Sequence, residues 1–263
     1  MRTPRLLGID FTSTPTRAKP ITVAHASAEG SALRIERIER LPTLAEFEAL
    51  LLRPGPWVGG FDFPFGLPRE LVRDLGWPAR WATLVALCAN LSRAELRGIL
   101  DGYRATRPAG RKYAHRRTDG PAGSSSPMKL VNPPVALMFH EGATRLADAG
   151  VHVPGLREGD RTRVALEAYP GLFARRVLGG VSYKSDERAK RTAERREARR
   201  RLVAALSARL SPALRRELVE DGTGDALDAA ICAVQAAWGW RRRRRNFGLP
   251  ARVVACEGWI VGA

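Results

Sequence analysis

Two short apolar segments, each ending in an aspartate, constrain the fold of this chain most strongly. Residues 5–10 read Arg-Leu-Leu-Gly-Ile-Asp, and residues 57–62 read Trp-Val-Gly-Gly-Phe-Asp. Apolar runs of this length are typical of buried strands, whereas helices need longer periodic segments. We therefore expect two strands of an α/β sheet, with Asp10 and Asp62 at the ends of these strands.

The remaining segments predict one α/β domain over residues 1–263. Strand-like patterns recur at residues 20–25, 32–38, 163–169 and 252–261. Thr43 and Glu46 form a capping box that opens a helix. Two later helices are expected, one charged and one apolar, at residues 185–210 and 223–238.

Residues 68–154 interrupt this alternation and predict a largely helical insertion. Candidate helices lie at residues 68–75, 78–91, 92–103 and 133–149. Between the last two, residues 119–127 have the Gly, Ser and Pro content of a loop. We interpret the insertion as a lid on the core domain.

The positive charge is concentrated in three segments. The chain has 44 Lys and Arg against 27 Asp and Glu, for a net charge of +17, and nearly all of the excess lies at 104–117, 184–201 and 241–245. Such clusters indicate a polyanionic partner such as DNA or RNA; three solvated surface segments are the alternative. The candidate nucleic-acid contacts are Arg104, Arg107, Arg111, Lys112, Arg116, Arg117, Lys184, Arg241, Arg242 and Arg243.

Several protein classes are excluded or disfavoured. Apolar runs are too short for a transmembrane helix, and no apolar segment follows the basic start as in a secretory signal. The three cysteines are widely spaced and form no zinc motif, so we expect a cytoplasmic protein without disulfide-linked partners. With 44% hydrophobic residues, the chain has enough apolar material for a core.

Five acids stand at the ends of predicted elements, and they are the candidate catalytic residues: Asp10, Asp62, Glu167, Asp225 and Asp228. Strand ends at one edge of a sheet lie close together, where open α/β sheets place their sites. Asp225 and Asp228 share a helix face because they are three residues apart. Clustered carboxylates favour a hard cation such as Mg²⁺ or Mn²⁺. Taken singly, each acid has an alternative role in a turn, a cap or an ion pair.

Five motifs carry a family resemblance. They begin at residues 7, 60, 167, 224 and 257, and the most specific read Phe-Asp-Phe-Pro-Phe-Gly-Leu-Pro and Glu-Ala-Tyr-Pro. Together they resemble the domain-of-unknown-function family 429, a predicted nuclease family with a ribonuclease-H-like fold. The resemblance implies a mixed five-stranded sheet flanked by helices. The late Asp-x-x-Asp is also similar to that of RuvC-type Holliday-junction resolvases, which implies the metal ligands Asp10, Asp62, Asp225 and Asp228.

The leading hypothesis is a metal-dependent nuclease that uses two ions to hydrolyse phosphodiester bonds. A non-catalytic nucleic-acid-binding protein on the same fold is the first alternative. An actin- or Hsp70-like phosphotransferase is the second, since Thr12 to Thr14 follow the first aspartate, but a second glycine-rich phosphate loop is missing. Lys184 is either a phosphate contact or a solvated lysine, and His115 either a proton shuttle or a loop residue.

Overall fold

A mixed sheet forms the centre of the protein. The computed structural model describes residues 3–30 and 32–263, and within them the sheet has seven strands in the order β5-β6-β4-β1-β2-β3-β7. The strands are β1 Arg5–Asp10, β2 Ile21–Glu29, β3 Ala32–Leu41, β4 Trp57–Asp62, β5 Val151–His152, β6 Asp160–Glu167 and β7 Ala208–Arg209. β2 is antiparallel to β1 and β3, and the other pairings are parallel. The chain is therefore an α/β protein, as predicted.

The expected strand count was too low. β5 and β7 add two residues each at the edges of the described sheet, and sequence patterning does not reveal strands so short. Residues 252–261 do not form the expected strand, because Ile260 makes only an isolated bridge to Glu167. By contrast, β1 and β4 have the predicted bounds.

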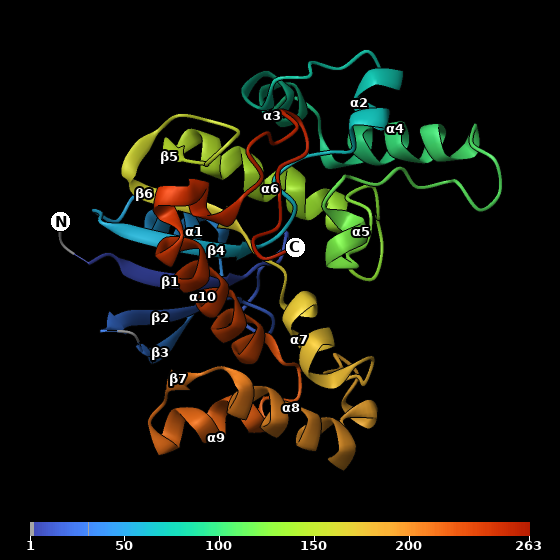
Figure 1. Ribbon diagram of the computed structural model, residues 1–263. Helices are drawn as coiled ribbons and strands as arrows, with labels where there is room; N and C mark the ends of the chain where they lie inside the picture. The colour runs from blue at the N-terminus through green and yellow to red at the C-terminus, as the bar shows by residue number, and fades with distance from the viewer. Residues whose placement is uncertain (1–2, 31) are drawn as a thin grey trace.

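Helices cover both faces of the sheet (Figure 1). They are α1 Leu44–Leu51, α2 Arg69–Asp74, α3 Trp81–Ala89, α4 Arg93–Ala105, α5 Asp119–Ala122, α6 Val135–Asp148, α7 Pro170–Leu178, α8 Ala193–Ala205, α9 Pro212–Glu220 and α10 Asp225–Arg241, with 3₁₀ turns at Arg188–Lys190 and Arg243–Gly248. The predicted capping box begins α1. The helix expected from residue 185 begins only at Ala193, because Thr192 caps it by accepting a hydrogen bond from the Arg195 backbone.

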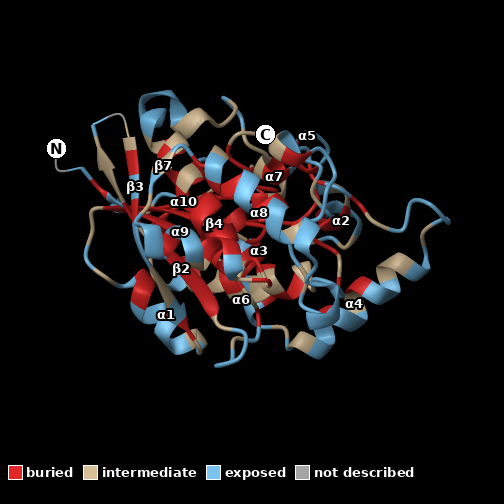
Figure 2. Cartoon of the chain, turned by 90° about the horizontal axis from the view of Figure 1, so that it is seen from below, coloured by how far each residue is buried: buried red, intermediate tan, exposed pale blue. Residues whose placement is uncertain are grey.

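The two faces of the sheet have separate cores because side chains alternate along a strand. Leu7 and Ile9 of β1 face a core shared with α1, α3 and α6. Leu6 faces the other core, with α8 and α10. Figure 2 shows that buried residues gather in the central sheet and in α10, whereas exposed residues lie on outer helices such as α4.

Two glycines let α10 approach the sheet closely. A Cβ at Gly8 of β1 would overlap the backbone of Ala229, and one at Gly60 of β4 would overlap the carbonyl oxygen of Cys232. Only glycine permits backbones to come this near each other. Because Asp10 and Asp62 follow these glycines by two residues, their side chains emerge on the α10 face of the sheet.

The cysteines and the helices bear on the predictions about disulfides and membrane spans. Cys88, Cys232 and Cys256 are buried free thiols. In the described part of the chain, no helix is both long and apolar enough to span a membrane.

Candidate metal centre

Three predicted carboxylates meet at the end of the sheet next to α10. Asp10 and Asp62 lie directly opposite each other as the last residues of the parallel pair β1 and β4. Asp228 comes from the first turn of α10, whose close approach is permitted by the glycines of these strands. One carboxylate oxygen from each of the three residues lies within 4.8 Å of the other two. This all-oxygen donor set fits a hard divalent cation.

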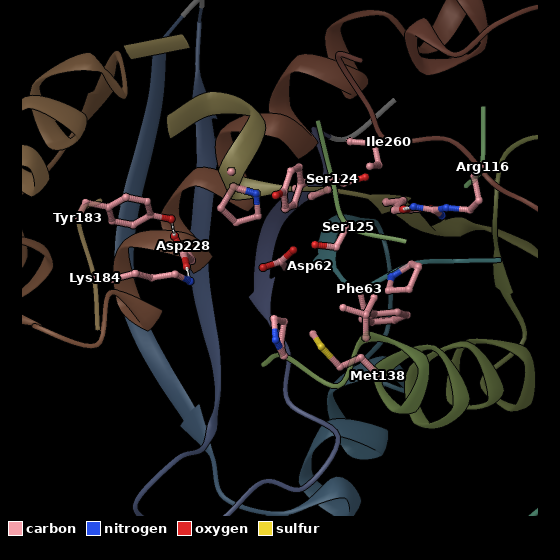
Figure 3. A pocket seen from close by; sticks show the side chains of 18 residues that line it. Asp62, Phe63, Arg116, Ser124, Ser125, Met138, Tyr183, Lys184, Asp228 and Ile260 are labelled. Atoms are coloured by element: carbon pink, nitrogen blue, oxygen red, sulfur yellow. Dashed lines mark hydrogen bonds and ion pairs between the residues drawn. The ribbon is translucent and has the colours of Figure 1, made fainter. Parts of the chain in front are cut away.

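Both oxygens of Asp228 have a partner on the segment before α8. The Tyr183 hydroxyl donates to Oδ1 at 2.5 Å, and the Lys184 ammonium donates to Oδ2. Although 42% of the Lys184 side chain is exposed, its ammonium contacts a carboxylate that is fully buried. Figure 3 shows Tyr183 and Lys184 directed at Asp228, with Asp62 facing them across a cavity.

The crowded carboxylates have raised pKa values. Burial raises the pKa of Asp10 well above its usual value, and repulsion from Asp225 adds to the effect. Burial, followed by repulsion from Asp228, raises the pKa of Asp62 to about 7. Burial disfavours the charged form of Lys184, but Asp228 outweighs it, so the lysine pKa is also raised well above its usual value. Ionising all three carboxylates would place more negative charge at the site than one lysine neutralises, and a divalent cation would relieve the repulsion between them.

Asp225 lies beside this group without joining the three carboxylates. It is the first residue of α10, and it lines a cavity of about 580 Å³ together with Asp10 and Asp62. Burial and the neighbouring Asp221 raise its pKa. Of the four predicted metal ligands, three are therefore brought together and the fourth faces the same space.

Glu167 lies in a different environment from the three clustered aspartates. It ends β6 on the opposite face from Asp62, because it pairs in register with Phe61 rather than with the aspartate. Its carboxylate is buried and accepts hydrogen bonds from the Phe65 backbone at 3.0 Å and from Arg116 at 2.9 Å. Burial raises its pKa despite the arginine. Glu167 therefore anchors the loop after β4. It is not one of the three clustered carboxylates, although it lines a cavity together with Asp62 and Asp228.

Arg116, one of the predicted nucleic-acid contacts, is buried and lines the same cavity as Glu167. Only 2% of its side chain is exposed, and its guanidinium pairs with Glu167 at 2.8 Å and with Asp119 at 2.9 Å. It also donates to the backbone oxygen of Glu257. Although burial lowers the pKa of Arg116, the two carboxylates outweigh it and raise the pKa. With its donors directed at these protein groups, this arginine is an internal cross-link.

The other predicted basic contacts fall into different environments. Arg107 is largely buried and pairs with Glu70 at 2.9 Å, and Arg104 pairs with Asp101 at 2.8 Å. The exposed members of the same segment are Arg111, Lys112 and Arg117. His115 is exposed and lines neither cavity of the site.

The basic run at 241–245 lies far from the carboxylates. Arg241 ends the helix that Asp225 begins, so about 24 Å of helix separates them at about 1.5 Å per residue. Arg242 stacks on Trp238 and Arg243 stacks on Trp240. The predicted contacts Arg241, Arg242 and Arg243 therefore do not lie beside the clustered carboxylates.

Two cavities meet at the carboxylate cluster. The larger, of about 580 Å³, is lined by Asp10, Thr12, Thr14 and Lys19 among others. The smaller, of about 310 Å³, has mostly apolar walls. Four residues line both cavities: Asp62, Pro133, Met138 and Lys184. A ligand over Asp62 therefore has access to both spaces.

Sequence reasoning missed several residues that shape the site. Tyr183 orients Asp228, and its position next to Lys184 was the available signal. Lys19 lines the larger cavity and pairs with Asp186 at 2.8 Å. Arg93 of α4 donates to the Ser13 backbone oxygen at 3.0 Å and so fixes the loop after Asp10. No local sequence pattern predicts this hydrogen bond, because the two residues are 80 positions apart.

The raised pKa of Asp62 predicts a pH-dependent penalty on stability. The native state binds this proton more tightly than the unfolded chain does, so stability is lost as pH rises from about 4 to about 7. In EDTA, Asp62→Asn is expected to raise the free energy of unfolding relative to wild type by up to about 4 kcal/mol at pH 8, at about 1.36 kcal/mol per pKa unit. The difference is expected to shrink toward pH 4.

Urea unfolding of both proteins at pH 4.5 and pH 8 measures this effect. Comparing the variant with wild type at each pH cancels the contribution of titrating groups that do not interact with Asp62. A difference that is the same at both pH values would contradict the electrostatic origin of the penalty.

The chain was also compared with known proteins. No curated protein and no solved structure matches it. Residues 8–248 match the model of a family described as protein of unknown function, DUF429. The match spans most of the chain and includes Asp10, Asp62, Asp225 and Asp228. The protein therefore belongs to the DUF429 family.

Proposed function

We propose that this protein is a divalent-metal-dependent nuclease that hydrolyses phosphodiester bonds of DNA or RNA. The observation that carries the proposal is the meeting of Asp10, Asp62 and Asp228 within 4.8 Å at the junction of two cavities. These carboxylates come from two adjacent strands and one helix, so the fold itself fixes their spacing. Rigid elements hold a catalytic constellation more precisely than loops do.

The fold supports the same proposal. Among the described strands, the five that have six or more residues form a mixed sheet in the order β3-β2-β1-β4-β6. Helix α7, which follows β6 directly, and helix α10 flank one face of this five-stranded sheet. We propose a ribonuclease-H-like core in which β5 and β7 are short edge additions, with residues 68–154 as its helical insertion.

The donor set fits Mg²⁺ or Mn²⁺. Asp10, Asp62 and Asp228 would hold the first ion, and Asp225, which lines the larger cavity with Asp10, would contribute to a second. When bound, a pair of such ions activates water and stabilises the leaving oxygen of a phosphodiester.

The protein's own side chains supply orientation and charge. The Tyr183 hydroxyl fixes the Asp228 carboxylate, and Arg93 fixes the loop that follows Asp10. Lys184 lines both cavities, so a phosphate group over the carboxylates lies beside its ammonium. Lys19 adds a second cation in the larger cavity. These lysines offset the repulsion between the acids and an incoming phosphate.

A substrate panel tests the proposal. The purified protein is incubated with Mg²⁺, Mn²⁺ or EDTA and with single-stranded, double-stranded and branched DNA and RNA. Cleavage that requires the metal supports the proposal. Salt-sensitive binding without cleavage, unchanged by EDTA, would contradict it and favour a non-catalytic nucleic-acid-binding protein.

A further inference from the structure

The smaller cavity has features that the proposed hydrolysis does not explain. It encloses about 310 Å³, roughly ten times the volume that a water molecule occupies in the liquid. We propose that this cavity receives one unpaired nucleobase next to the scissile phosphate, so that the substrate is single-stranded or locally unpaired. The inference rests on the proposed function, because it places a nucleotide over the same carboxylates.

The walls of the cavity suit a flat aromatic ring. Phe63 and Met138 lie on one side, and Tyr183 faces them from across the cavity (Figure 3). Tyr169 and Ile260 contribute further apolar surface. Flipped or unpaired bases are bound in such pockets, between aromatic and apolar side chains.

Tyr169 is held in place before any ligand arrives. A Cβ at Gly171 would overlap its ring, so glycine leaves the space that the ring occupies. The guanidinium of Arg175 lies over the ring at 5.5 Å from its centroid. Arg175 is itself anchored by a hydrogen bond to the backbone oxygen of Ala122. A preordered wall loses little conformational entropy when a base stacks on it.

The polar groups of the cavity connect the base to the phosphate site. Asp62, Asp228 and Lys184 line it, so a base inside has its own backbone at the carboxylate cluster. Ser124 and Ser125 add hydroxyls at the edge of the cavity (Figure 3). Asp228, Lys184 and Ser124 already have partners within the protein. An acyl chain offers no hydrogen bond to the Asp62 carboxylate or the Ser125 hydroxyl, whereas a base has hydrogen-bonding edges to meet them.

Base pairing is incompatible with this placement. A base inserted between the walls of this cavity cannot also stack and pair within an intact duplex, so duplex substrates bear the cost of unpairing. We therefore expect a higher affinity for single strands than for duplexes, in both DNA and RNA.

An abasic scan tests the inference. Single-stranded oligonucleotides carry one abasic site at successive positions, and binding is measured with Ca²⁺ in place of Mg²⁺. Stacking on one aromatic ring predicts that the wild type loses about tenfold in affinity at one position. Tyr169→Ala is expected to lose about tenfold with the intact strand and to be insensitive to the abasic site.

Matched variants separate stacking from folding defects. Tyr169→Phe keeps the ring and is expected to retain both the affinity and the abasic sensitivity. Ser125→Trp, at an exposed loop position, narrows the cavity and is expected to lower single-strand affinity about tenfold. Leu52→Ala, at a residue that is 63% exposed and outside both cavities, is the control.

The outcomes distinguish the inference from the proposed function. Equal affinity for single strand and duplex, with a flat abasic scan, overturns the inference even if the protein cleaves. Position-specific abasic sensitivity without cleavage in Mg²⁺ or Mn²⁺ supports the inference and contradicts the nuclease. An absence of binding to every nucleic acid overturns both.

Discussion

The Asp10→Asn variant is expected to lose metal-dependent cleavage by about 10³-fold or more while keeping the fold. The substitution replaces one of the three clustered carboxylates with a neutral amide, which is a weaker donor for the proposed ion, and it keeps the shape of the side chain on β1. Ion-mediated stabilisation of a phosphoryl transition state is worth several kcal/mol, and each 1.36 kcal/mol is a factor of ten in rate. The measurement is kcat/KM on the oligonucleotide that wild type cleaves best.

A matched substitution controls for the change of charge. Asp148→Asn, at the exposed end of α6, removes one carboxylate outside both cavities and is expected to cleave like wild type. Because burial and neighbouring like charges raise the pKa of the half-buried Asp10 carboxylate, Asp10→Asn is expected to unfold at or above the wild-type temperature in EDTA. Wild-type cleavage by Asp10→Asn would show that the carboxylate cluster is not the catalytic site.

Arg116→Ala is expected to lower the free energy of unfolding by about 3–5 kcal/mol. The substitution leaves Glu167 and Asp119 buried without their cation, and breaking a buried ion pair costs about this much. For a chain of this length the loss corresponds to a Tm lower by about 6–20 °C. Thermal and urea unfolding measure it.

A neighbouring arginine provides the comparison. Arg117→Ala, at an exposed side chain one residue later, is expected to stay within about 0.5 kcal/mol of wild type. If Arg116→Ala is as stable as Arg117→Ala, the ion pairs with Glu167 and Asp119 do not hold the loop after α4 against the sheet.

The sequence predicted the aspartates of the site but not the separate role of Glu167. Asp10 and Asp62 end buried strands. Because the ends of neighbouring parallel strands lie at the same edge of a sheet, their proximity follows from the sequence pattern alone. Glu167 ends a strand as well, yet its face depends on the pairing register, which local patterning does not contain. A shift of one residue relative to Asp62 places it on the other side of the sheet.

Charge clusters were predicted as segments, but their partners were not. Arg116 lies in a run without acids, and its two carboxylate partners come from the start of α5 and from the end of β6. Only the folded chain brings Glu167 to it, across 51 positions. The distant location of Arg241, in contrast, follows from helix length alone once α10 is known to begin at the acids.

The strands likewise divide into those that have a local sequence signal and those that depend on tertiary contacts. β1 and β4 carry their own apolar signal and were predicted with their exact bounds. β7 has two residues, and its pairing with Leu33 and Arg34 of β3 comes from tertiary contact rather than from pattern. Residues 252–261 are partly apolar, but Ile260 alone pairs with the sheet.

Direct measurement of Mn²⁺ binding tests the central claim that Asp10, Asp62 and Asp228 form a metal centre. The electron paramagnetic resonance signal of free Mn²⁺ is followed as wild-type protein, Asp10→Asn and Asp148→Asn are added at pH 8. We predict that wild type and Asp148→Asn remove at least one Mn²⁺ per chain from the free pool and that Asp10→Asn does not. Equal Mn²⁺ binding by all three proteins, or binding by none, would contradict the account.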